Sequence, residues 1–331
     1  MSKVTVRQVA EEANVSIATV SRVLAGMDNV RPATTERVRA AMTALGYSPN
    51  RMAQSLRSQR TMNLGIVLPG FDNPFFFELI KQAVDVAGDS GYSVVIAGGE
   101  DPFTEARRLV DGKLVDGLVF VAPSHALDVP AEALELGLPL VAFDRAPADL
   151  DCPLIQVDNV RGAREVTEHL IATGARSIAH ITGPAHLEVS QQRRAGYEQA
   201  LTDAGMKLDP SLVLEGDFTE RRGAQAMIDL LNRADRPDAV FAANDLSAIG
   251  ALSAATHLSQ VPHTIQVAGF DGLTVSKYTS PALTTYTQPI HTIARLSVER
   301  LIELIRDPES TSAESILVPG TLVVRQSTHQ E

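Results

Sequence analysis

The sequence predicts an α/β protein, with a small helical head followed by a two-lobed core of doubly wound parallel sheets. Apolar residues follow a helical spacing over residues 5–46, and a polar stretch over 49–61 carries little apolar content. From residue 63 onward, short apolar runs alternate with amphipathic segments in two series of similar length. Strands that alternate with helices are typical of right-handed βαβ crossovers, which produce parallel sheets.

Composition narrows the class of protein. The chain has 331 residues, which exceeds one typical core, and its 44% hydrophobic content argues against global disorder. The single cysteine, Cys152, excludes an internal disulfide and agrees with a reducing compartment. No apolar run is long enough to span a membrane, and the first residues do not resemble a signal peptide. We therefore expect a cytoplasmic protein without a membrane partner.

The charge is unevenly distributed. The whole chain carries a net charge of −11, but residues 1–60 hold nine basic and four acidic side chains, which leaves +5 on the head and −16 on the rest. A basic head on an acidic body concentrates the attraction for phosphates in one place. This distribution indicates a nucleic-acid partner, with a merely solvated charged head as the alternative.

The head is predicted to contain three helices. Thr5 is placed to cap the first helix, and Asn14 tolerates the left-handed backbone of a tight turn. Ser16 caps the second helix, and the third begins at Pro32 and ends before Gly46. Two helices joined by a short turn and braced by a third form the minimal core of a helix-turn-helix.

The core is predicted from its apolar runs. In the first series the strands are "LGIVLPG", "SVVIAGG", "LVDGLVFVAP", "LPLVAFDR" and "PLIQVDN"; in the second they are "SIAHITGP", "LVLEGDF", "DAVFAAND" and "IQVAGFD". The helices between them include "FFFELIKQAVDVAGDSGY", "VTEHLIATGA", "QRRAGYEQALTDAG" and residues 221–232. Ligands of such sheets bind at the carboxyl ends of the strands. Charged, amide and aromatic residues collect at these ends, which favours a polar, hydroxyl-rich ligand.

Several stretches carry a family resemblance, among them "VTVRQVAEEANVSIATVSRVLAG", "ALGYSPNRMAQSLRS", "NPFF", "RRAGYEQAL" and "FAANDLSAIGAL". With them the whole chain resembles the LacI/GalR family of bacterial repressors. The resemblance implies a helix-turn-helix DNA-binding domain over 1–48, a hinge helix over 49–61 and a periplasmic-binding-protein-like core. One lobe of this core is expected over 62–158 and 290–318, and the other over 159–289 and 319–331.

The second helix of a helix-turn-helix enters the major groove of DNA. On that helix Ile17 and Ala18 suit a thymine methyl group, and Arg22 can donate bidentately to guanine. Five further polar residues are predicted to contact phosphates, namely Thr5, Ser16, Thr19, Ser21 and Asn29. For Ser16, a purely capping role is the alternative.

The resemblance also assigns a role to the polar stretch over 49–61. It implies that this stretch forms a hinge helix on the operator and that Leu56 inserts into the minor groove and kinks the DNA. Asn50, Ala53 and Arg57 are expected to contact DNA beside it. An exposed leucine without a role is the alternative. The expected operator is near-palindromic, with a central CG step.

The resemblance further implies that a sugar, sugar phosphate or nucleoside binds as effector between the lobes. The expected effector-binding residues are Asp72, Phe75, Phe76, Arg145, Asp158, Arg193, Phe218, Asn244 and Asp271. Arg193 matches the arginine that grips a ligand hydroxyl or carboxylate, and Phe218 occupies a stacking position. Two alternatives remain open: Phe75 and Phe76 belong to the core, and Asp158 caps the following helix.

These features predict a homodimeric repressor of carbohydrate or nucleoside catabolism genes that its effector releases from DNA. The alternatives keep the DNA-binding role but replace release with a co-repressor ligand or a protein partner. An enzyme is not expected, because GxSxG, HExxH, P-loop and CxxC motifs are all absent from the sequence. The eight histidines show no metal-ligand spacing, so neither a metal nor a cofactor is predicted. The attached head argues against a periplasmic binding protein.

Overall fold

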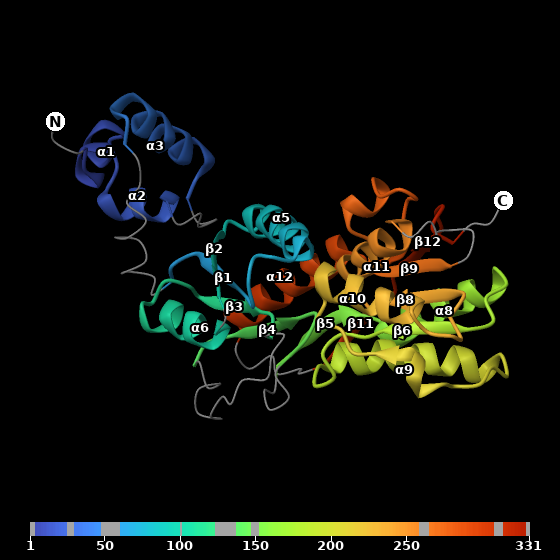
Figure 1. Cartoon of the computed structure of the whole chain (residues 1–331). Coiled ribbons are helices and arrows are strands. Elements are labelled where there is room, and N and C mark those ends of the chain that lie inside the picture. The colour runs from blue at the N-terminus through green and yellow to red at the C-terminus, as the bar shows by residue number, and fades with distance from the viewer. Residues whose placement is uncertain are drawn as a thin grey trace. The chain divides into compact units, whose positions relative to one another are not determined.

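The structure is a computed structural model that describes residues 4–24, 30–47, 60–99, 101–122, 137–146, 152–257, 265–307 and 314–328. The chain forms two compact units, Met1–Thr61 and Met62–Glu331 (Figure 1). The predicted hinge helix falls almost wholly on residues 48–59, which lie outside the described ranges.

The head contains three helices, α1 (Val6–Glu12), α2 (Ile17–Leu24) and α3 (Pro32–Leu45), as predicted. Thr5 caps α1 reciprocally with Gln8: its backbone N donates to Gln8 Oε1 over 2.9 Å, and its hydroxyl accepts from the backbone N of Gln8. Asn14 adopts the left-handed conformation, with a φ of 51°, in the turn between α1 and α2. Local capping and turn signals therefore define the helix ends.

The core of the head takes one fully buried valine from each helix, Val9, Val20 and Val38, each 0% exposed. Ala10, Ala13 and Ala41 complete the buried cluster. Small and β-branched side chains let the three short helices approach closely enough to exclude water. This packing positions α2 with its other face on the surface.

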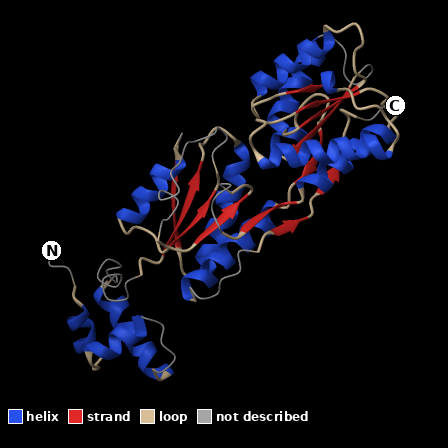
Figure 2. Ribbon diagram, turned by 90° about the horizontal axis from the view of Figure 1, so that it is seen from below, coloured by secondary structure: helices blue, strands red, loops and turns tan. Residues whose placement is uncertain are grey.

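Two six-stranded sheets form the second unit, among the residues that the structure describes (Figure 2). The first has the order β11-β5-β4-β3-β1-β2 and the second β12-β10-β9-β8-β6-β7, so both follow one doubly wound pattern. Among the strands of the described ranges, only β10 and β12 pair antiparallel. The strands are β1 (Asn63–Leu68), β2 (Ser93–Gly98), β3 (Gly117–Phe120), β4 (Leu140–Phe143), β5 (Leu154–Val157), β6 (Ile178–Ile181), β7 (Val213–Leu214), β8 (Ala239–Ala242), β9 (Gln266–Asp271), β10 (Thr284–Thr287), β11 (Ile316–Val318) and β12 (Thr321–Val323). The predicted α/β class is confirmed.

Helices cover both faces of each sheet (Figure 2). Strand β8 shows why both faces need cover: Phe241 packs into one apolar cluster and its neighbour Val240 into another, and both are 0% exposed. The helices of this unit are α5 (Pro74–Asp89), α6 (Pro102–Asp111), α8 (Asn159–Ala172), α9 (Glu188–Asp203), α10 (Glu220–Leu231), α11 (Asp245–His257) and α12 (Ile290–Arg306), with 3₁₀ turns η1 (Pro210–Leu212) and η2 (Thr274–Lys277).

The chain passes between the sheets three times, from β5 to α8, from β10 to α12 and from β11 to β12. Two of these crossings touch, because the backbone N of Gly320 donates to the hydroxyl of Tyr286 over 2.9 Å. A Cβ atom on Gly320 would lie 2.5 Å from the carbonyl oxygen of Thr287, so only glycine fits this contact. The crossings bring the strand ends of both sheets to one place.

A buried histidine makes the core sensitive to acid. His180 on β6 is 0% exposed, stacks between the rings of Tyr197 and Phe241, and donates from Nδ1 to the carbonyl oxygen of Phe241 over 2.9 Å. Burial lowers its pKa from 6.5 to about 4. Because the unfolded chain binds this proton first, stability is complete above pH 6.5 and falls as the pH decreases to about 4.

We expect the loss to reach about 3 kcal/mol by pH 4. Urea unfolding of a His180→Gln variant across this range should show a much flatter pH dependence than the parent. His186→Gln is the matched control, because His186 is exposed, and it should retain the parental slope. Equal slopes for the His180 variant and the parent would contradict the assignment.

Candidate functional site

The base-reading residues predicted on α2 lie on its surface. Ile17, Ala18 and Arg22 are exposed, with Ile17 43% exposed, while Val20 between them is buried. The hydroxyl of Ser16 accepts a hydrogen bond from the backbone N of Thr19 over 3.1 Å, so Ser16 caps the helix. The face of α2 opposite the core is thus available to a major groove.

The remaining DNA-contact predictions divide into two groups. Thr5 is exposed, and Thr19 and Ser21 are half-buried on the head. Asn29, Asn50, Ala53, Leu56 and Arg57 lie outside the described residues. The phosphate contacts and the minor-groove insertion therefore stay predictions.

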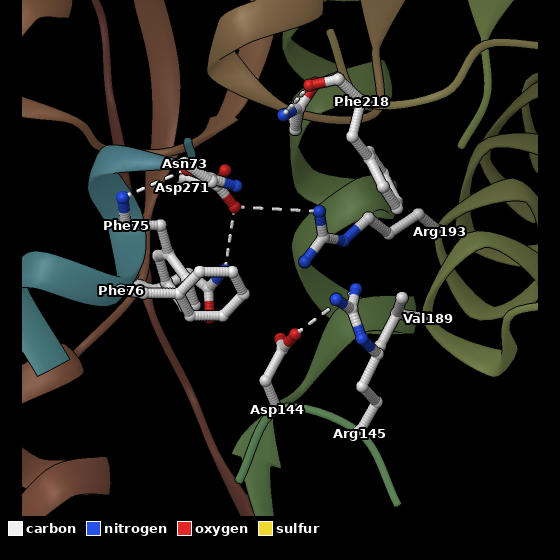
Figure 3. A pocket seen from close by; sticks show the side chains of 11 residues that line it. Asn73, Phe75, Phe76, Asp144, Arg145, Val189, Arg193, Phe218 and Asp271 are labelled. Atoms are coloured by element: carbon white, nitrogen blue, oxygen red, sulfur yellow. Dashed lines mark hydrogen bonds and ion pairs between the residues drawn. The ribbon is translucent and has the colours of Figure 1, made fainter. Parts of the chain in front are cut away.

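A pocket lies where the carboxyl ends of strands from both sheets meet (Figure 3). It is lined by Asn73, Phe75, Phe76, Asp144, Arg145, Val189, Arg193, Phe218, Asn244, Asp271 and Gln288. Seven of the nine predicted effector-binding residues are brought together here, and Asp72 and Asp158 are not among the lining residues. The position agrees with the rule for ligand sites in doubly wound sheets.

Arg193 on α9 is the most constrained side chain of the pocket. It is 3% exposed, donates from Nε to Asn159 Oδ1 over 2.8 Å and donates from Nη1 to the carbonyl oxygen of Ala243 over 2.6 Å. Its guanidinium lies 4.0 Å from the centre of the Phe270 ring. These contacts hold the planar donor set in place before any ligand arrives.

Asp271 at the end of β9 is the counter-ion of Arg193. Its Oδ1 lies 3.6 Å from Arg193 Nη1 and accepts from Gln288 Nε2 over 2.8 Å. Burial raises the pKa of the Asp271 carboxyl, and the guanidinium of Arg193 opposes this rise. A ligand hydroxyl placed between the two side chains can donate to the carboxyl and accept from the guanidinium.

Asp144 and Arg145 form a second buried pair at the end of β4. Asp144 Oδ2 lies 3.8 Å from Arg145 Nη1, and Arg145 Nε donates to the carbonyl oxygen of Ala122 over 2.6 Å. Asp144 Oδ1 is buried and has no hydrogen-bond partner among the described residues. An unsatisfied buried acceptor in a pocket wall is suited to a ligand donor.

Three pocket residues have positive φ angles although they are not glycine: Asp144 (62°), Phe218 (67°) and Asp271 (122°). Asp144 directly follows β4, Asp271 ends β9, and Phe218 lies in the segment between β7 and α10. Such backbones cost about 1–3 kcal/mol each and cluster at functional sites. Asn244 supports one of them, because its Nδ2 donates to the carbonyl oxygen of Phe218 over 3.0 Å.

The sequence left alternative roles open for Phe75, Phe76 and Asp158, and the structure shows the contacts that each of them makes. Phe75 and Phe76 are both core and pocket residues, since they are 3% and 6% exposed and line the pocket, and Phe75 packs against both Phe76 and Phe143. Asp158 caps α8, where its Oδ1 accepts from the backbone N of Arg161 over 3.1 Å. Asp72 is exposed and borders an adjacent outer cavity instead.

Four lining residues were not predicted, namely Asn73, Asp144, Val189 and Gln288. Asp144 directly precedes Arg145 at the end of a predicted strand, so the strand-end rule already pointed to it. Gln288 follows β10, a strand that the apolar pattern did not reveal. Val189 has no signal in the sequence beyond its position one turn before Arg193 on α9.

The pocket is small in this structure. Its cavity volume is about 20 Å³, enough for about one water molecule, whereas the outer cavity measures about 190 Å³. The two share Asn73, Phe76, Arg145 and Phe218 as walls. A ring-sized ligand must therefore displace one of these walls, either by turning a side chain or by separating the lobes.

Two further findings concern the described ranges as a whole. No group of three or more histidine, cysteine, aspartate or glutamate side chains is placed there to hold a metal ion. None of the helices found in these ranges is long and apolar enough to cross a membrane.

Two known families match separate parts of the chain. The family of bacterial regulatory proteins, lacI family, matches residues 5–50, and the periplasmic binding protein-like domain matches residues 167–328. The HTH-type transcriptional regulator CelR of Thermobifida fusca is 34% identical over 333 residues, which cover 98% of each chain.

Solved structures resemble the whole chain as well. The transcriptional regulator CelR–cellobiose complex superposes with a TM-score of 0.75 at 34% identity and covers 98% of this chain and 100% of its own. The lac repressor dimer bound to operator and the anti-inducer ONPF gives a TM-score of 0.82 at 29% identity over 99% of each chain. These relatives are transcriptional regulators and not enzymes, which confirms the prediction that the chain is not an enzyme. The chain therefore belongs to the LacI family of bacterial regulatory proteins, and it is a helix-turn-helix, DNA-binding transcriptional regulator.

Proposed function

We propose that the chain is a homodimeric cytoplasmic repressor of carbohydrate or nucleoside catabolism genes, released from a near-palindromic operator by an effector. The effector is held between one lobe over 62–158 with 290–318 and another over 159–289 with 319–331. The observation that carries this proposal is the buried pair of Arg193 and Asp271 facing Asp144 and Arg145 across a pocket at the strand ends.

The chemistry of the pocket favours a neutral, hydroxyl-rich effector. Each arginine has its own carboxylate, so the pocket offers no uncompensated positive charge to a phosphate. Arginine donors, carboxylate acceptors and the amide of Asn244 line the same cavity, which suits a polyhydroxyl ligand. Phe218 adds an aromatic face for a ring. The cellobiose complex of CelR supports a carbohydrate.

The size of the pocket supports a link between effector and DNA binding. The cavity holds about one water, and we propose that a more open arrangement of the lobes, rather than a turned side chain, makes room for a ring-sized effector. Preferential binding to that arrangement shifts the population toward it. We propose that the open arrangement favours release from the operator.

On the DNA side, we propose that Ile17, Ala18 and Arg22 read bases, with phosphate contacts from Thr5, Ser16, Thr19, Ser21 and Asn29. An Arg22→Ala variant should lose about 1–3 kcal/mol of operator affinity and discriminate less well at one guanine. Fluorescence anisotropy with the operator and single-base variants measures both effects. Arg39→Ala removes an equally exposed charge from α3 and should leave base preference unchanged. Retained guanine preference in the Arg22 variant would contradict the assignment.

For the hinge, the sequence supports minor-groove insertion by Leu56, with Asn50, Ala53 and Arg57 beside it on the DNA. This part of the proposal rests on the family resemblance of residues 49–61.

Exposed apolar side chains on the core support a dimer. On α5, Phe77 is 55% exposed and Val84 is 44% exposed; the two lie seven residues apart on one helical face. Ile96 on the edge strand β2 is 43% exposed, and Tyr278 beyond η2 is 80% exposed. The lac repressor, which this chain resembles, is a dimer on its operator. A second copy of the chain is therefore the expected partner of this surface.

Replacing Phe77 by glutamate should convert the dimer to a monomer and weaken operator binding at least tenfold, because one head reads only a half-site. Analytical ultracentrifugation gives the oligomeric state and anisotropy gives the affinity. Leu208→Glu is the control, since Leu208 is 41% exposed and lies in the other lobe, away from α5. A Phe77 variant that remains dimeric would refute this interface.

One experiment tests the proposed function as a whole. The full chain is used to select its operator from random duplex DNA, and operator binding is then titrated with a panel of sugars, sugar phosphates and nucleosides. We expect a palindromic site and release by a neutral member of the panel. Tighter operator binding with a panel member would indicate a co-repressor, and regulation by a protein alone would indicate the partner-controlled alternative. Selection of no site at all would overturn the proposal.

A further inference from the structure

Asp245, the first residue of α11, accepts three hydrogen bonds behind the pocket. It is 0% exposed and follows Asn244, a lining residue, but does not line the pocket itself. Its Oδ2 accepts from the backbone N of Leu273 over 2.7 Å and from the hydroxyl of Ser276 over 2.5 Å. Its Oδ1 accepts from the hydroxyl of Thr285 over 2.5 Å. Burying a carboxylate is costly, and these three donors offset that cost.

The network continues to the backbone directly after Asp271. The hydroxyl of Thr285 also accepts from the backbone N of Gly272 over 3.2 Å. Asp245 therefore holds both amides that follow Asp271, that of Leu273 directly and that of Gly272 through Thr285.

The held segment has a backbone that does not persist by itself. Asp271 has a φ of 122° and Gly272 a φ of 77°, and an added Cβ on Gly272 would lie 2.5 Å from Oγ1 of Thr287. Gly269 leaves the space that the carboxylate occupies, because a Cβ there would lie 2.5 Å from Asp245 Oδ1. Unfavourable φ values survive only where the surroundings determine them. On one side the pairing of β9 with β10 and the bond from the backbone N of Gln288 to the carbonyl oxygen of Asp271 hold this residue; on the other, the hydrogen bonds from the 272–273 amides hold the backbone that follows it.

We infer that Asp245 is a positioning residue for the effector: through Thr285 and Leu273 it fixes the backbone that presents Asp271 to Arg193. This inference rests on the proposed function, because it assigns a role in the same pocket. Asn244 and Asp245 have different roles, since the first lines the pocket and the second holds the backbone after Asp271 from behind the pocket.

The test removes the bridging hydroxyl without changing side-chain shape. A Thr285→Val variant of the full chain is titrated with cellobiose, ribose and cytidine in the operator-release assay, and amide exchange is followed over residues 270–278. We expect about a tenfold loss of affinity for whichever of the three probes acts on the parent, together with faster exchange. Operator affinity without effector should change less than about twofold, whereas a merely structural role would lower it too.

Two controls keep the inference falsifiable. Thr285→Ser retains the hydroxyl and should restore effector affinity and slow exchange. Thr284→Val removes an equally buried hydroxyl that bonds instead to Arg325 and Thr328. Equal losses of effector affinity in the two valine variants, or no loss in either, would overturn the inference. If the parent responds to none of the three probes, release by these three ligands is excluded, and amide exchange alone decides the positioning role.

Discussion

Replacing Arg193 by lysine should weaken effector binding by about a hundredfold although the positive charge is retained. Lysine cannot reproduce the planar donor set that reaches Asn159 on one side and the carbonyl oxygen of Ala243 on the other. Both acceptors then stay buried without their donor, at about 1–3 kcal/mol each. The stacking over Phe270 is lost as well. Calorimetric titration with the effector identified in the operator-release screen measures the change.

The neighbouring arginine is the natural control. Arg194 lies on the same helix, its side chain is 51% exposed, and it pairs with Glu198 one turn away over 2.7 Å. Exposed pairs of this kind contribute about 0.3–0.5 kcal/mol, so Arg194→Lys should leave effector affinity unchanged and stability nearly so. An Arg193→Lys variant that binds effector within a few-fold of the parent would show that the planar donor set of Arg193 is not needed for effector binding.

The substitution with the largest expected effect on stability is Gly250→Ala, which should cost about 3 kcal/mol or more. Helices α10 and α11 approach each other through two glycines that face backbone. A Cβ on Gly250 would lie 1.9 Å from the carbonyl oxygen of Glu220, and one on Gly223 would lie 2.1 Å from that of Ser247. Backbone cannot rotate away as a side chain does, so the two helices must move apart. Their separation would loosen the apolar cluster that both helices share with β8.

A second glycine-to-alanine change should increase the stability of the protein instead. Gly88 lies within α5, and an added Cβ there meets nothing within 4 Å. Gly88→Ala should therefore stabilise the protein by about 0.5–1 kcal/mol, because alanine loses less backbone entropy on folding. Urea unfolding followed by circular dichroism compares the two variants with the parent. An unchanged midpoint for Gly250→Ala would refute the close-packing argument.

The head shows which features are readable without a structure. The cap at Thr5, the turn at Asn14, the proline at the start of α3 and the glycine at its end each act through residues three or four positions away. Capping and turn residues of this kind can be identified from the neighbouring residues in the sequence. The positions of most strands along the chain were likewise predictable, since strands such as β1, β3, β4 and β8 are mainly apolar runs.

The elements that the apolar pattern missed have physical reasons. Helix α11 is buried against both β9 and α10, so it is apolar almost all round and shows no amphipathic period. Strand β10 consists of three threonines and a tyrosine, which are β-formers but do not form an apolar run. The stretch "LVLEGDF" yields only the two-residue strand β7, and the chain then bends at Phe218, which has a φ of 67° and lines the pocket.

The class of fold, the helix-turn-helix and seven of the residues that line the pocket were all predictable from the sequence. The three-dimensional fold was needed to show that Asp158 caps a helix, that Gln288 lines the pocket, and that Asp245 anchors Asp271 from behind. The reason is the separation along the chain of the residues that determine each feature. Caps and strands depend on neighbours along the chain, whereas the pocket depends on three crossings that bring distant strand ends together and on the burial that raises the pKa of Asp271.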